Sequence, residues 1–215
     1  MKLHLIAFYN YVGMFSEHYA FLVELHLRLI DEHTRAIDEL TTHIEEEMIP
    51  FQVARDLMVT IPGISTKVAD VIIAETGADM SRFPTAGHLA SWADTCPGSN
   101  ESASRVKSTR TRLGNPYLKS ALGTTAMAAS SGKDTYLAAK NWRIASGRGS
   151  IKTVVALEHA MLVAVWNMLQ SGETYSDLGS NYFTKRDPEN AKDRALNQLR
   201  NLGYLLTIEA EADVA

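Results

Sequence analysis

The chain has 215 residues, of which 46% are hydrophobic, enough for one compact domain with a sizeable core and an appended element such as a long helix. Its single cysteine, Cys96, excludes an intrachain disulfide and a cysteine-based zinc site, as expected of a protein of the reducing cytosol. The formal net charge of -4 argues against a nucleic-acid partner only if the charge is spread evenly along the chain.

Residues 1–16 form an unassigned leader. The leader is rather apolar, but His4 and Asn10 interrupt it and no small-residue cleavage site follows, so no signal peptide is predicted. The later apolar stretch 151–169 carries Lys152 and Glu158, which favours a buried core helix over a membrane span. We therefore expect a soluble, cytoplasmic protein with no membrane partner.

Residues 17–50 predict one long amphipathic helix that resembles a coiled-coil helix and ends at Pro50. Its apolar stripe, with steps of three and four, consists of Leu22, Leu25, Leu29, His33, Ile37, Leu40, Ile44 and Met48. A partner helix must cover this stripe, either from the same chain or from a second protomer. Because no antiparallel mate is evident in the sequence, a homo-oligomer formed through this helix is the favoured interpretation.

Residues 51–180 predict a compact helical domain that opens with two helices joined by the turn Ile61-Pro62-Gly63. Ser65 is suited to cap the second helix. This arrangement resembles the helix-hairpin-helix motif, in which turn amides and a helix N-terminus bind a phosphate group without reading bases. The candidate contacts are Pro62, Gly63, Ser65 and Lys67. The alternative is a purely structural turn, since Ser65 replaces the glycine usual in the motif.

A short helix is predicted from Phe83 to Trp92, followed by a polar loop over residues 94–114. The next helix begins at Asn115, an N-cap residue, and Pro116, which suits the first helical position. Residues 181–215 form a C-terminal helix and tail that carry no recognisable chemistry. The predicted fold class is therefore all-α, or mainly α.

Basic residues are concentrated between residues 103 and 152, where Asp134 is the only acid. The bases are Arg105, Lys107, Arg110, Arg112, Lys119, Lys133, Lys140, Arg143, Arg148 and Lys152. This excess implies a polyanionic partner, with Arg105, Lys107, Arg110, Arg112 and Lys119 as the candidate DNA or RNA contacts.

The stretch that runs from Cys96 through Asn100-Glu101-Ser102 to Gly114-Asn115 resembles the C-terminal domain of the Piv/MooV-like insertion-sequence transposases. These enzymes are bridge-RNA-guided serine recombinases that also carry a DEDD nuclease domain. The resemblance covers about four-fifths of the chain. Further matching motifs, in order, are the acidic helix, Ile61-Pro62-Gly63, Phe83, Leu89-Ala90-Ser91-Trp92-Ala93, Tyr175-Ser176-Asp177-Leu178-Gly179 and Leu202-Gly203-Tyr204. The resemblance implies DNA transposition, with DNA and a guide RNA as partners.

The resemblance also implies that Ser102 is the nucleophile. A serine hydroxyl that attacks a DNA phosphodiester forms a phosphoserine link that conserves bond energy, so strands can be rejoined without an external energy source. The hydroxyl needs a base or a metal for deprotonation, and cations such as Arg105 and Lys107 to stabilise the phosphoryl charge. Glu101 is interpreted as a local polar contact rather than the general base.

In the resembled family, four carboxylates of an N-terminal domain bind Mg²⁺, and nothing before Ser16 is long enough to be that domain. The seven acids Asp31, Glu32, Asp38, Glu39, Glu45, Glu46 and Glu47 are interpreted as the solvated face of the long helix, with Arg35 as the only base among them. We therefore expect no metal ligand and no cofactor in this chain. It is interpreted as a truncated copy or an excised domain that is inactive as a transposase on its own.

Two residues depart from the resembled family, since Asp94 and Ser104 stand where glycine is usual. Either change affects the permitted backbone angles and could misplace Ser102. Cys96 is interpreted as a small buried residue. His88 and His159 lie on apolar helical stretches and are interpreted as neither ligands nor catalysts.

Three functions remain open on the sequence. The first is the DNA-binding, strand-exchange part of a transposase with Ser102 as nucleophile. The second is a non-catalytic helix-hairpin-helix module that binds nucleic acid. The third, a helical oligomerisation protein without a nucleic-acid role, is disfavoured by the basic excess between residues 103 and 152.

Overall fold

The structure, a computed structural model, describes residues 17–96, 98, 100–102, 105–108, 111 and 114–205. For residues 100–102 and 105–107 it describes the backbone alone. The chain divides into two compact units, residues 1–52 and 53–215. Each unit is described by itself.

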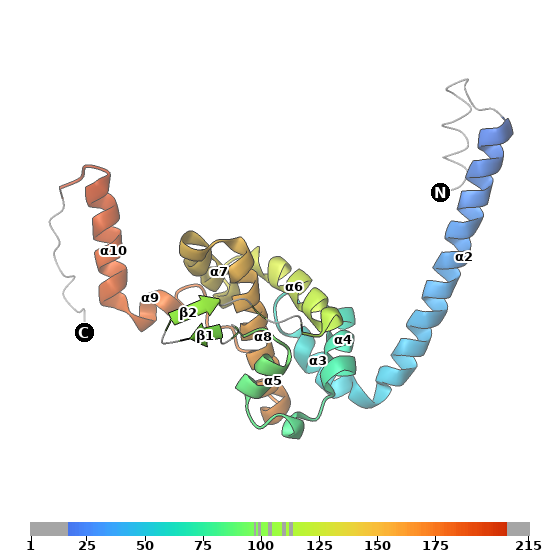
Figure 1. The fold of residues 1–215 in the computed structure, drawn as a ribbon, viewed down its shortest axis with the longest axis horizontal. Coiled ribbons are helices and arrows are strands. Elements are labelled where there is room, and N and C mark those ends of the chain that lie inside the picture. The colour runs from blue at the N-terminus through green and yellow to red at the C-terminus, as the bar shows by residue number, and fades with distance from the viewer. Residues whose placement is uncertain are drawn as a thin grey trace, which may run out of the picture. The chain divides into compact units, whose positions relative to one another are not determined.

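The first unit contains the long helix α2, Glu17–Met48, followed by the short 3-10 helix η1, Ile49–Phe51 (Figure 1). The prediction of one unbroken helix is confirmed, and it ends two residues before Pro50, which lies in the first turn of η1. The predicted stripe is largely exposed: Leu29, Ile37, Leu40 and Ile44 are 42%, 58%, 62% and 47% exposed. No described part of this unit covers these four side chains.

The second unit is mainly helical, as the sequence predicts. Its elements in chain order are α3 (Gln52–Val59, which begins at the boundary), α4 (Thr66–Thr76), η2 (Met80–Arg82), α5 (Ala86–Trp92), β1 (Asn100–Ser102), β2 (Arg105–Ser108), α6 (Pro116–Ser130), α7 (Tyr136–Arg148), α8 (Ser150–Ser171), α9 (Tyr182–Arg186) and α10 (Pro188–Asn201). The strands β1 and β2 lie within the segment predicted as a loop, and they form a short antiparallel pair.

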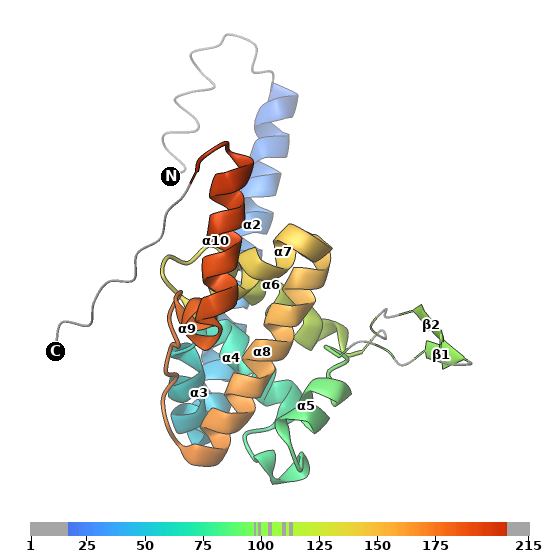
Figure 2. The ribbon, with the colours of Figure 1, turned by 90° about the vertical axis from the view of Figure 1, so that its left-hand side faces the viewer.

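Helix α8 is the core of the second unit, where it contacts η2, α5, α6 and α7. Figure 2 shows it crossing the length of this unit with α5 and α7 beside it. Its side chains Leu157, Met161, Leu162 and Val165 are at most 1% exposed. By length and composition α8 would be long and apolar enough to cross a membrane. The contacts that it makes instead identify it as the predicted core helix.

Two predicted helix caps are present in the structure. The Ser65 hydroxyl accepts a hydrogen bond from the Val68 amide at 3.4 Å and opens α4. The Asn115 side chain accepts from the amides of Tyr117 and Leu118, at 2.9 and 3.1 Å, and opens α6. Both residues satisfy amides that have no partner within the helix.

The predicted helix from Phe83 to Trp92 begins later than expected. Phe83 has φ -120° and ψ 102°, an extended conformation that the following Pro84 imposes on the residue before it. Thr85 is the true cap, because its hydroxyl accepts from the His88 amide at 3.3 Å. Helix α5 therefore starts at Ala86.

The segment after α8 forms hydrogen bonds with two parts of the second unit, the Pro-Gly turn and the start of α7. The Tyr175 amide donates to Thr60 Oγ1 at 3.0 Å, next to the Pro-Gly turn. Asp177 Oδ1 accepts from the Tyr136 amide at 2.8 Å, at the start of α7. Burial, together with the nearby Asp177 carboxylate, raises the pKa of Tyr175 to about 12. The Tyr-Ser-Asp-Leu-Gly motif is thus a structural connection between the turn and α7.

Candidate nucleic-acid and strand-exchange site

The Pro-Gly turn is held on the core by two isoleucines and leaves its candidate contacts exposed. Ile61 and Ile64 are 1% and 5% exposed, and the Ile64 amide donates to the Ile61 carbonyl at 3.1 Å. Gly63, Ser65 and Lys67 are exposed, while Pro62 is half-buried. The turn therefore presents a helix N-terminus and a lysine to solvent, the arrangement that suits an anion.

Gly63 also has a packing role that the sequence did not indicate. Its φ of +90° lies in the region that favours glycine, and a Cβ at this position would lie 2.8 Å from the Thr125 carbonyl oxygen on α6. The same Cβ would lie 3.1 Å from the Ala129 amide nitrogen. Glycine is required here because the turn and α6 approach each other backbone to backbone.

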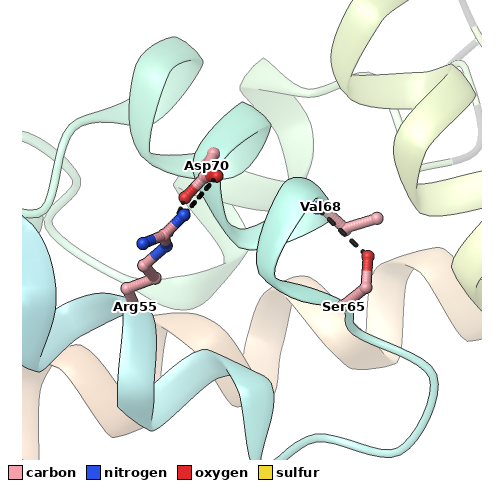
Figure 3. A network of polar contacts seen from close by, with 4 residues as sticks. All are labelled: Arg55, Ser65, Val68 and Asp70. Carbon is pink, nitrogen blue, oxygen red and sulfur yellow. Dashed lines mark hydrogen bonds and ion pairs between the residues drawn. The ribbon is translucent and has the colours of Figure 1, made fainter. Parts of the chain in front are cut away.

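A buried ion pair joins the two helices on either side of this turn (Figure 3). Arg55 Nε on α3 lies 2.7 Å from Asp70 Oδ1 on α4, and Arg55 Nη2 donates a hydrogen bond to Asp70 Oδ2 at 2.8 Å. The two side chains are only 6% and 14% exposed. The sequence analysis did not anticipate this pair, and its fifteen-residue separation matches no local helix spacing.

Ser102 is the last residue of β1, where the chain reverses into β2. The antiparallel register pairs Ser102 with Arg105 and Glu101 with Val106, and the connection between the strands is two residues long. We call residues 100–108 the serine hairpin. Figure 2 shows its strands projecting away from the helices of this unit.

Lys107 occupies an irregular position in the serine hairpin. Because Asn100 pairs with Ser108 and Glu101 with Val106, Lys107 is an extra residue between two paired positions, as in a β-bulge. Arg110, Arg112 and Ser104 lie outside the described residues. The register of the hairpin thus pairs Ser102 with one basic residue, Arg105, while the second, Lys107, lies at the bulge.

The serine hairpin leaves and re-enters the helical unit at adjoining points. Asp94 has φ +54°, and Gly114, also at φ +54°, lies so close that a Cβ on it would be 2.8 Å from the Asp94 Cβ. The left-handed conformation at Asp94 explains why glycine suits this position, although Asp adopts it more readily than most residues. Asp94 is therefore compatible with the backbone conformation found here.

One titratable side chain on α8, His159, lies close to the start of this loop. Cys96 Sγ is 3.6 Å from His159 Nδ1. Burial, followed by the nearby Lys140 charge, lowers the pKa of His159, while burial and the Asp94 charge raise the pKa of Cys96. The prediction of a small buried Cys96 is correct only in part, because the residue is half-buried.

Glu158, the neighbour of His159, is 5% exposed, and among the described atoms its Oε2 has no hydrogen-bond partner. Burial raises the pKa of Glu158, and the charge of Lys119 on α6 opposes that shift. Lys119, a candidate nucleic-acid contact, therefore also compensates a buried carboxylate. Neither Glu158 nor His159 was singled out as functional by the sequence.

The candidate residues fall at the two ends of α6. The Pro-Gly turn packs against Thr125 and Ala129, near the C-terminal end of α6. The loop that carries the serine hairpin ends just before Asn115, at the N-terminal end of α6. At 1.5 Å per residue, the two points are about 15–20 Å apart. Lys119 lies at the hairpin end. The structure thus gives two separate groups of candidate contacts.

The part of the chain that the structure describes contains no group of three or more His, Cys, Asp or Glu side chains that could hold a metal ion. In particular, the acidic residues of α2 from Asp31 to Glu47 are exposed on a single helix.

Comparisons with known proteins found one matching family model and one curated relative. Residues 55–142 match the sequence model of the Transposase IS116/IS110/IS902 family. The chain is also 27% identical, over 120 residues, to an uncharacterised 43.6 kDa protein of insertion element IS110 from Streptomyces coelicolor A3(2). That alignment covers 55% of this chain and 29% of the relative, so the chain spans less than a third of the relative's length. Residues 55–142, which include the Pro-Gly turn and the serine hairpin, are thus similar to a transposase domain of the IS116/IS110/IS902 family.

Proposed function

We propose that this chain provides the DNA-binding and strand-exchange part of an insertion-sequence transposase of the Piv/MooV-like serine recombinase group, with Ser102 as the nucleophile. The observation that carries the proposal is the pairing of Ser102 with Arg105 at the end of a hairpin inside the transposase-like segment. A basic residue opposite the hydroxyl residue is suited to a phosphodiester substrate.

The proposed chemistry is two successive transfers of one phosphoryl group. Ser102 Oγ attacks the phosphorus atom of a DNA strand, so that a P–Oγ bond forms and a P–O bond to deoxyribose breaks. The serine proton passes to a base, and the deoxyribose oxygen takes up a proton and leaves as a hydroxyl group. The hydroxyl of a second DNA strand then attacks the phosphoserine and releases Ser102. Arg105, Lys107, Arg110 and Arg112 are the proposed cations around the phosphoryl oxygens.

The metal site that would promote deprotonation of the attacking hydroxyl is proposed to lie on a separate carboxylate-bearing domain. Mg²⁺ bound there would lower the pKa of an attacking hydroxyl and neutralise phosphoryl charge. The residues of this chain would bind DNA, and a guide RNA, and would position the serine.

Covalent capture tests the role of Ser102. The chain is incubated with element-end DNA, guide RNA and Mg²⁺, with and without a purified carboxylate-bearing domain, and a protein–DNA adduct is sought on a denaturing gel. We expect an adduct when the domain is present, its loss in Ser102→Ala, and its retention in Ser120→Ala, a matched change at an exposed serine on α6. An adduct that survives in Ser102→Ala would eliminate Ser102 as the nucleophile.

The exposed Gly63, Ser65 and Lys67 support a second candidate, a non-catalytic nucleic-acid-binding module. Both candidates require phosphate contacts, which release counterions and make affinity fall with salt. Salt-dependent DNA binding without any adduct would favour the second candidate. Binding that is independent of salt would reject both.

The exposed stripe of α2 supports a proposal about assembly. A 32-residue helix with an unpaired apolar stripe gains most of its stability from a partner helix. We propose that the partner is α2 of a second copy of this chain.

A further inference from the structure

The first and last residues of the loop that carries Ser102 lie next to each other and are closely packed. Gly114 leaves no room for a Cβ beside Asp94 and the Ala93 carbonyl oxygen, at 2.8 and 3.1 Å. Thr95 is 2% exposed, and both its amide and its hydroxyl donate to the Ala90 carbonyl at 3.1 Å. We call residues 94–96 together with Gly114 and Asn115 the loop base.

Side chains from two other helices reach the loop base, one at each end. At its start, His159 Nδ1 on α8 lies 3.6 Å from Cys96 Sγ. At its end, the side-chain nitrogen of Asn115, Nδ2, donates to Glu75 Oε2 on α4. The Asn115 oxygen is already occupied by the first amides of α6, so Asn115 links α4, α6 and the loop end at once.

The histidine contact is a neutral hydrogen bond. Burial lowers the pKa of His159 and raises that of Cys96, so both groups are uncharged near pH 7, and the imidazole tautomer decides whether the thiol or Nδ1–H is the donor. A thiol held in this form is a poor nucleophile, which leaves anchoring as the physical effect of the contact.

We propose that Glu75 and His159 are positioning residues for the loop that carries Ser102, Glu75 acting through Asn115 and His159 through Cys96. The effect on chemistry rests on the proposed function of Ser102, whereas the anchoring of the hairpin does not. Loss of either anchor lets the hairpin move relative to the helices. Because a displacement of about 1 Å can lower a reaction rate roughly a hundredfold, the strand-exchange rate would suffer while DNA affinity is kept.

The test compares anchor-breaking variants with conservative ones in the full chain. Glu75→Ala and His159→Phe remove the polar partners of Asn115 and Cys96. Glu75→Gln keeps an oxygen that can accept from Asn115, and His159→Asn keeps an amide that can accept from or donate to Cys96. Amide hydrogen exchange is measured for β1, β2, α6 and α8. We expect roughly fivefold faster exchange in β1 and β2 of the breaking variants, unchanged exchange in α6 and α8, and wild-type behaviour in the conservative variants.

Adduct formation and DNA affinity are then measured on the same proteins, with the carboxylate-bearing domain present. The breaking variants should form the adduct at least about tenfold more slowly, with a Kd within twofold of wild type. Unchanged exchange in β1 and β2, or faster exchange that extends to α6 and α8, would overturn the proposal. If the hairpin exchanges as expected but wild type forms no adduct, the anchoring stands and the strand-exchange function fails.

Discussion

The Arg55–Asp70 pair places two opposite charges almost entirely out of water between α3 and α4. Desolvation of both groups costs several kcal/mol, and their attraction and hydrogen bond offset that cost only while both are present. The pair therefore contributes more to the correct apposition of the two helices than to net stability. This apposition in turn fixes the Pro-Gly turn between them.

Single and paired substitutions separate these effects. Arg55→Met alone leaves the Asp70 carboxylate without its partner and should lower the free energy of unfolding by about 3–5 kcal/mol. The double variant Arg55→Met with Asp70→Leu removes both charges and should recover most of that loss. Urea denaturation monitored by circular dichroism measures both. Equal losses in the single and double variants would show that the ion pair is not the source of the effect.

Glu158 makes stability depend on pH. Its pKa is raised by burial, so the native state binds more protons than the unfolded state above the ordinary value of 4.5. The free energy of unfolding therefore falls as pH rises from 4.5 through the native pKa, and the full penalty is present above that pKa. Glu158→Gln should stabilise the protein at pH 7, and this gain should shrink as pH falls to 4.5.

Denaturation of the wild type and Glu158→Gln at several pH values checks this expectation. Glu173→Gln, the same chemical change at an exposed position, is the matched control and should alter stability at neither pH. A Glu158→Gln gain that grows toward acid pH would show that the carboxylate is stabilised, not penalised, in the folded protein.

At the scale of elements, helix boundaries could be predicted wherever a local chemical signal existed. Ser65 and Asn115 cap α4 and α6 as expected, and α2 ends just before Pro50. The start of α5 was misplaced because the effect of Pro84 on Phe83 outweighed the apolar pattern. The serine hairpin was predicted as loop, since residues 100–108 show no alternation of apolar and polar side chains.

The candidate site could be predicted only in part. The turn residues were proposed from a short motif, and Ser102 from a family resemblance, because both kinds of signal lie in continuous stretches of the chain. Contacts that join distant segments, such as Cys96 with His159 and Asn115 with Glu75, leave no periodic signal and needed the structure. His159 was set aside as a residue of an apolar helix, although it contacts the loop base.

Helix α2 provides the prediction at this scale. If its stripe pairs with a second copy, Leu40→Glu puts a charge into the apolar contact and should shift the protein from dimer or higher oligomer to monomer. Thr42→Glu, an exposed neighbour outside the stripe, adds the same charge and should leave assembly unchanged. Sedimentation velocity at several concentrations measures the outcome. A wild-type chain that sediments as a monomer at all concentrations would reject the proposed partner.

At the scale of the molecule, the two groups of candidate contacts lie at opposite ends of α6, about 15–20 Å apart. One DNA strand spans that distance in roughly four to six nucleotides, at 3.4 Å per nucleotide. The Pro-Gly turn and the serine hairpin therefore cannot hold the same phosphate. If the turn binds one phosphate of a strand and the hairpin reacts with another, the protein fixes the distance between these two phosphates.

Ethylation interference on element-end DNA measures this distance. Wild type should show two clusters of essential phosphates at least about four nucleotides apart, because the hairpin extends beyond its anchoring point. Lys67→Ala should remove one cluster and Arg105→Ala the other, each lowering the salt dependence of binding by about one phosphate contact. Lys192→Ala loses the same charge on α10, where the lysine pairs with Glu189, and should keep both clusters. If Lys67→Ala and Arg105→Ala lose the same phosphates, the turn and the hairpin serve one contact, and the separation along α6 has no role in how DNA is held.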